Sequence, residues 1–149
     1  MSGSNLVAVK KELIRRLGEE PALAGVQVTY APPRDIKREV ICGGKAKTSH
    51  TLTAMRGGPA AHLPRDEQAT LTLYIQVRNP QSDALAADER VMELLQVVEE
   101  LLAADSTLAG FPHLLLAGVS GVELAEPAFD DDGVTSGLAA EISYRSYLS

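Results

Sequence analysis

A glycine-lysine pair near the middle of the chain resembles part of a phosphate-binding loop. Such a loop needs a glycine five positions before the pair and a Ser or Thr directly after it. In this sequence the pair is Gly44-Lys45, and the two required positions hold Glu39 and Ala46. The glycine turn and the Mg²⁺-binding hydroxyl are both missing, so we do not expect a nucleotide site here.

The histidines and the single cysteine lack the neighbours that a catalytic or metal site needs. His50 and His62 fall in one irregular stretch and His113 lies much further along the chain, so no two share a ligand spacing on a helix. Cys42 has no nucleophile signature around it, and we expect it to be a small buried side chain. We therefore predict no catalytic residue, no metal, no cofactor and no enzymatic activity.

Three consecutive aspartates suggest a cation loop, with Glu141 at the twelfth position counted from the first of them. A calcium loop of the EF-hand type needs alternating ligands and a glycine at the sixth position. That position holds Thr135. We interpret Asp130, Asp131 and Asp132 as a solvated turn that leads into Gly133.

Length and composition indicate one soluble globular domain. The chain has 149 residues, of which 45% are hydrophobic and 23% charged, and this suits a single core. One cysteine permits no internal disulfide, which fits a reducing compartment. No apolar run is long enough to cross a membrane, and no signal peptide begins the chain. We expect the protein to be made and folded in cytoplasm.

Charge is divided unevenly along the chain. Residues 1–65 hold 11 Lys and Arg against 5 Asp and Glu, whereas residues 66–149 hold 3 against 15. The division fits a nucleic-acid contact, or a basic surface of one copy that meets an acidic surface of another. The uneven charge carries no functional information if the two halves of the chain intermix on folding. Stacking on nucleic-acid bases is disfavoured because residues 31–73 contain no aromatic side chain.

Hydrophobic periodicity predicts two helices and several strands. Apolar residues recur at helical spacing over 5–18 and, most clearly, over 84–104. Alternation or β-forming residues predict strands at 26–30, 39–42, 70–78, 114–124 and 138–145, with a bulge near Gly118 or Gly121. Gly43-Gly44 is expected to end the strand at 39–42. The order of elements predicts an α+β fold, with a mixed or antiparallel sheet and two helices on one face.

Residues 43–66 are predicted to form a flexible arm or hairpin, with an exposed strand near 48–54. This stretch contains four glycines and two prolines, and long irregular segments inside compact domains are usually functional or disordered. Its cations are candidates for contact with another protein: Lys45, Lys47, Arg56 and Arg65. The sheet face that the two helices leave bare should be solvated or covered by another subunit.

The layout resembles the tail terminator, or tail-completion, proteins of long-tailed bacteriophages. The resemblance rests on the opening amphipathic helix, Val-Gln-Val-Thr-Tyr at 26–30 with paired prolines after it, and the strand Leu-Thr-Leu-Tyr-Ile-Gln-Val at 71–77. It continues with the long helix at 91–102 and Glu-Ile-Ser-Tyr at 141–144. These features span nearly the whole chain and form no sharp motif.

The resemblance implies a ring, typically of six copies, that caps the finished tail tube and joins it to the connector of the DNA-filled head. The partners would be further copies of the chain, the tail tube protein and the connector or stopper protein, in the virion after assembly in the host cytoplasm. DNA would pass through without specific binding, so the lumen should be neutral or acidic. The lumen candidates are Glu123, Glu126, Asp130, Asp131 and Asp132.

Two other functions remain open from the sequence. One is a different neck or connector protein of the virion. The other is a small, non-enzymatic module that binds a ligand. A closed ring in solution would favour the virion proteins, and a monomer would favour the ligand-binding module.

Overall fold

The computed structural model describes residues 6–52, 65–105 and 114–148. For 49–52, 65, 66, 114–116 and 146–148 it describes the backbone alone. Within these ranges the fold is α+β, with two helices and a six-strand mixed sheet. The elements follow the chain in this order: α1 (Leu6–Glu19), a short 3-10 turn (Pro21–Leu23), β1 (Gln27–Thr29), β2 (Glu39–Leu52), β3 (Arg65–Asn79), α2 (Ala84–Ala104), β4 (Leu114–Leu124), β5 (Ala128–Asp130) and β6 (Gly133–Leu148).

Both helices lie where the periodicity predicts them. The carboxylate of Asp83 accepts a hydrogen bond from the Ala86 amide at 3.0 Å and so caps the first turn of α2, which satisfies one of the free amides there. Pro21 lies just beyond α1 and begins the 3-10 turn, because proline cannot donate the next helical hydrogen bond. The predicted bounds, 5–18 and 84–104, agree with the observed ones within one residue.

The sheet order is β1-β2-β3-β6-β4, and β5 pairs with the start of β6. β1 runs parallel to β2, and the other pairs are antiparallel. β5 was not predicted. It has three residues, all exposed, so its sequence carries no buried alternation to mark it as a strand.

Gly43-Gly44 does not end a strand, contrary to the prediction. β2 continues to Leu52, and its pairing with β3 shifts register between Gly43 and Ala46. A Cβ atom on Gly43 would collide with the backbone carbonyl of Tyr30, and one on Gly44 with the ring of Tyr74. The glycines therefore allow a bulge where other parts of the chain approach closely. Another register shift, between Val119 and Gly121 of β4, confirms the predicted bulge there.

The segment 43–66, predicted to be a flexible arm or hairpin, begins and ends in paired strands, as a hairpin does. Residues 43–52 belong to β2 and residues 65 and 66 begin β3, and the two strands pair antiparallel from Leu52 and Arg65 inward. This confirms a strand near 48–54 as far as Leu52. Residues 53–64 lie outside the described part of the chain.

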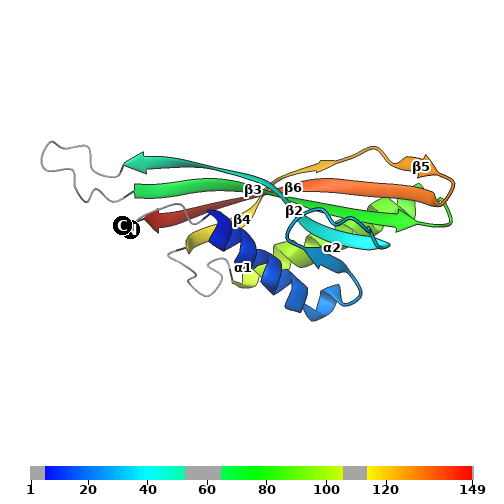
Figure 1. Cartoon of the computed structure of the whole chain (residues 1–149), viewed down its shortest axis with the longest axis horizontal. Coiled ribbons are helices and arrows are strands. Elements are labelled where there is room, and N and C mark those ends of the chain that lie inside the picture. The colour runs from blue at the N-terminus through cyan, green and yellow to red at the C-terminus, as the bar shows by residue number, and fades with distance from the viewer. Residues whose placement is uncertain (1–5, 53–64, 106–113, 149) are drawn as a thin grey trace, which may run out of the picture.

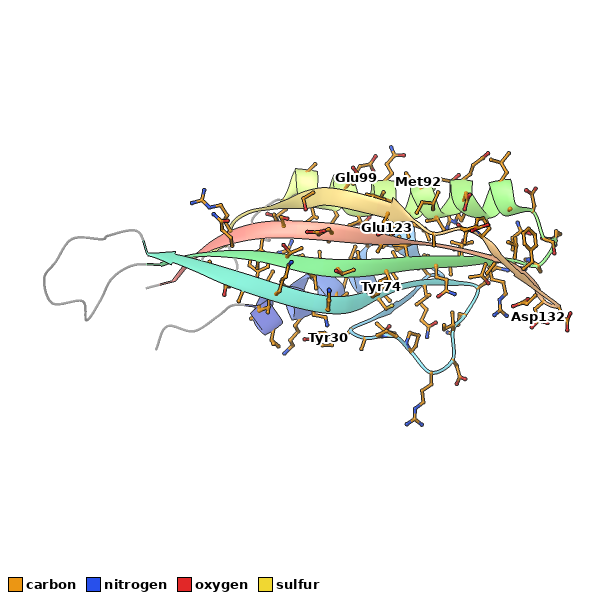
Figure 2. All side chains as sticks on the ribbon, turned by 90° about the horizontal axis from the view of Figure 1, so that it is seen from above. Tyr30, Tyr74, Met92, Glu99, Glu123 and Asp132 are labelled. Atoms are coloured by element: carbon orange, nitrogen blue, oxygen red, sulfur yellow. The ribbon has the colours of Figure 1, made fainter. Side chains whose placement is uncertain are left out.

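One face of the sheet carries both helices, as predicted (Figure 1). Alternate residues of β3 and β6 are buried there against α2, among them Leu73, Ile75 and Ala140. From α2, Leu94, Leu95 and the other stripe residues are almost fully buried, although Leu101 is only partly so. The opposite face, called the outer face below, carries no helix of the described chain (Figure 2).

Candidate assembly surfaces

The sheet order keeps the two charged halves of the chain apart. β1 and β2 come from the basic half and form one edge, while β4 and β5 come from the acidic half and lie along the other. β3 and β6 separate them. The halves therefore do not intermix across the sheet, and the sequence asymmetry becomes an asymmetry between its two edges (Figure 2).

Residues 30–38, called the proline loop below, project at the basic edge. The side-chain amide of Gln27 fixes their course: its nitrogen donates to the Asp35 carbonyl at 3.1 Å, and its oxygen accepts from the Lys37 amide at 3.0 Å. Ile36 is 47% exposed, and Arg34 and Lys37 are exposed beside it. This loop was not predicted from the sequence, although a pair of prolines followed by a charged run marks its position.

The four predicted basic contact residues divide into two groups. Lys45 and Lys47 lie exposed on β2, at the same edge as the proline loop. Arg56 lies outside the described residues, and only the backbone of Arg65 is described, at the start of β3. Lys10, which was not a candidate, is held inward. Its ammonium donates to the Gly44 carbonyl at 2.9 Å and lies 4.2 Å from the centre of the Tyr30 ring.

The predicted acidic residues lie in two places rather than one. Glu123 is on β4, opposite Ala139 of β6, whereas Asp130 is opposite Gly133. Six residues of β6 separate these positions, or roughly 20 Å of strand. Asp131 and Asp132 form the exposed turn between β5 and β6, and Asp130 accepts a hydrogen bond from the Asp132 amide at 2.7 Å, which confirms the predicted turn.

The outer face is hollowed near Glu123 and Glu126. This hollow, called the trough below, has a volume of about 640 Å³. The hollow forms because the residues between the Tyr74 ring and the two glutamates, Gly137 and Ala139, have small side chains or none. Alanines and Pro32 contribute further apolar lining. The trough is thus a mainly apolar depression with two carboxylates on one side.

Cys42 also lines the trough but is only 5% exposed. Burial raises the pKa of its thiol, and the Lys10 charge lowers it by less. A thiol with a raised pKa holds its proton at neutral pH, which makes it a weak nucleophile. The predicted role of Cys42 as a small buried side chain is confirmed.

Several charges elsewhere on the molecule are paired within the chain. Arg90 binds Glu39 of β2 at 2.6 Å and Glu93 at 3.0 Å, while Arg16 binds Asp105 at 2.8 Å. In contrast, the exposed cations of the proline loop (Arg34, Lys37 and Arg38) and the two trough glutamates form no ion pair with any residue that the structure describes. These cations and glutamates, which are opposite in sign, therefore lie on two different parts of the sheet.

One buried acid was missed by the sequence analysis. Glu67, near the start of β3, is completely buried on the helical face. Burial, helped by the Glu67 carboxylate, raises the pKa of the nearby Tyr144 phenol. Only strand parity pointed to this placement, since Glu67 alternates in phase with Ala69 and Leu71.

No cluster of three or more His, Cys, Asp or Glu side chains suitable for a metal ion occurs among the described residues. In the same part of the chain, neither helix has the length and apolar character that crossing a membrane requires.

Comparison of the chain with models of known protein families finds no match, and comparison with curated proteins finds none either. Function is therefore inferred from the surfaces described above.

Proposed function

We propose that the chain is a structural virion protein, the ring-forming tail terminator of a long-tailed bacteriophage. The observation that carries the proposal is the separation of unpaired basic and acidic groups onto different surfaces of one sheet. Such surfaces complement each other when copies associate head to tail. Head-to-tail contacts form a ring if the rotation between copies closes, and a filament if it does not.

The proposal gives each surface a role. The charged surfaces join neighbouring copies, because a basic patch attracts an acidic patch and repels another basic one. The two ends of the ring then contact the tail tube protein and the head connector. Phage DNA crosses the lumen, where acidic groups such as the turn at 130–132 limit binding to phosphates.

The test uses purified protein and tail tubes assembled without a terminator. Native mass spectrometry and electron microscopy should reveal a closed ring, and addition of the protein should halt elongation of the tubes. A matched control is the same assay at high ionic strength, which screens charged contacts. A chain that stays monomeric, alone and with tubes, would refute the proposal, and so would a ring that leaves tube growth unchanged.

Two alternatives make different predictions in the same assays. Another neck protein would form a ring that binds the connector but does not stop tube growth. A small ligand-binding module is supported by the trough, whose volume of about 640 Å³ falls in the range of ligand pockets. Such a module would remain monomeric, and a metabolite would raise its melting temperature.

A further inference from the structure

The proline loop has the form of an anchor. Ile36 is a large apolar side chain that is 47% exposed, and the exposed cations Arg34 and Lys37 lie close to it in sequence. The two hydrogen bonds from Gln27 hold the backbone on both sides of Ile36. A loop already held in one conformation loses little entropy when it docks.

The trough has the form of the matching socket. It is mainly apolar, and Glu123 and Glu126 border it without an ion pair among the described residues. Ile36 does not line the trough of its own chain, although Pro32 does. Each copy thus presents both an anchor, with Ile36 at its tip, and a socket, and the two adjoin at Pro32.

We infer that the proline loop of one copy docks in the trough of the next, with Ile36 in the apolar hollow and Arg34 and Lys37 facing Glu123 and Glu126. The inference rests on the proposed ring and names its subunit contact. A second copy is the occupant that the surfaces fit, because every copy carries both the basic loop with its apolar Ile36 and the apolar trough with its two glutamates. Glu123 and Glu126 then belong to the interface, which leaves the turn at 130–132 as the lumen candidate.

Charge reversal tests this contact directly. The loop variant carries Arg34→Glu and Lys37→Glu, and the trough variant carries Glu123→Lys and Glu126→Lys. Each alone should dissociate at least about tenfold more readily than the original chain, because like charges then meet at every contact. An equal mixture should reassemble into complexes in which the variants alternate, since each loop again faces a trough of opposite charge.

Three further proteins complete the experiment. Ile36→Ser should also weaken association, and because Ile36 is half exposed its thermal melt should change little. Lys11→Glu and Glu99→Lys reverse exposed charges on the two helices and should assemble normally. Assembly is measured by analytical ultracentrifugation, and by electron microscopy of tube ends if the chain assembles only on tubes. Circular dichroism checks that every variant is folded.

The possible outcomes separate this inference from the proposed function. Rings that survive both reversals, or a mixture that fails to reassemble, would overturn the inference while a tail terminator remained possible. Rescue by mixing without any effect on tube growth would support the contact and overturn the proposed function. Rescue by mixing together with restored capping would support both.

Discussion

Replacing Leu95 by alanine tests whether α2 is anchored to the sheet as the structure describes. Leu95 is only 2% exposed and belongs to the main apolar core. Leu→Ala at such a site removes buried methyl groups and leaves a cavity, at a cost of about 2–5 kcal/mol in the free energy of unfolding. For a domain of this size each kcal/mol lowers the melting temperature by roughly 2–4 °C, so we expect a fall of roughly 4–20 °C.

The matched control is Leu85→Ala, which makes the same chemical change in the first turn of α2. Leu85 is 68% exposed, and substitutions at such sites usually change stability by less than about 0.5 kcal/mol. Urea denaturation followed by circular dichroism gives both free energies at 25 °C, and an unchanged slope would show that the unfolded states are comparable. Equal effects of the two substitutions would refute the packing of α2 described here.

Three other predictions concern the bulge, the buried tyrosine and the acidic turn. Gly43→Ala should reduce the free energy of unfolding by about 1–3 kcal/mol through overpacking, and so lower the melting temperature. Gly18→Ala should not, since a Cβ there meets nothing within 4 Å. The raised pKa of the Tyr144 phenol means that the folded chain holds this proton more tightly, so its contribution to stability is complete below pH 10 and is lost as the pH rises above it. Stability measured from pH 8 to 11.5 should therefore fall less steeply in Tyr144→Phe than in Tyr74→Phe, and equal slopes would contradict this. Reversing the acidic turn should leave the ring intact but slow DNA delivery in an infection assay, and normal delivery would count against a lumen position. The reversal combines Asp130→Lys, Asp131→Lys and Asp132→Lys.

The elements with strong periodicity were predictable from the sequence. The stripe that includes Leu94 and Leu95 gave the bounds of α2, and the alternation around Leu73 gave the centre of β3. The ends of the long strands were not predictable, because pairing with neighbours decides them. Gly43 illustrates this: glycine usually interrupts a strand, but here its missing side chain admits the Tyr30 carbonyl and the strand continues.

The candidate surfaces were only partly predictable. Residue counts gave the sign of the net charge on each half of the chain. The sheet order, however, decides whether the basic and acidic residues are intermixed or separated in the fold. The proline loop was overlooked because its cations are interrupted by Asp35 and Ile36, so no unbroken basic run stands out. The trough could not be predicted, since it forms where Gly137 of β6 comes beside Tyr74 and Glu123 across three strands.

The place of β6 between β3 and β4 has a consequence for how the chain folds as it leaves the ribosome. β6 follows β3 and β4 in the described chain, yet it pairs with 15 residues of β3 and supplies the sheet partner of β4. Until it emerges, β3 has one open edge and β4 has no neighbour in the sheet. Open edges invite pairing with other chains, so nascent or truncated chains that lack β6 should be prone to aggregate. The domain therefore completes its fold only after β6 has been synthesised, through contacts between residues far apart in sequence.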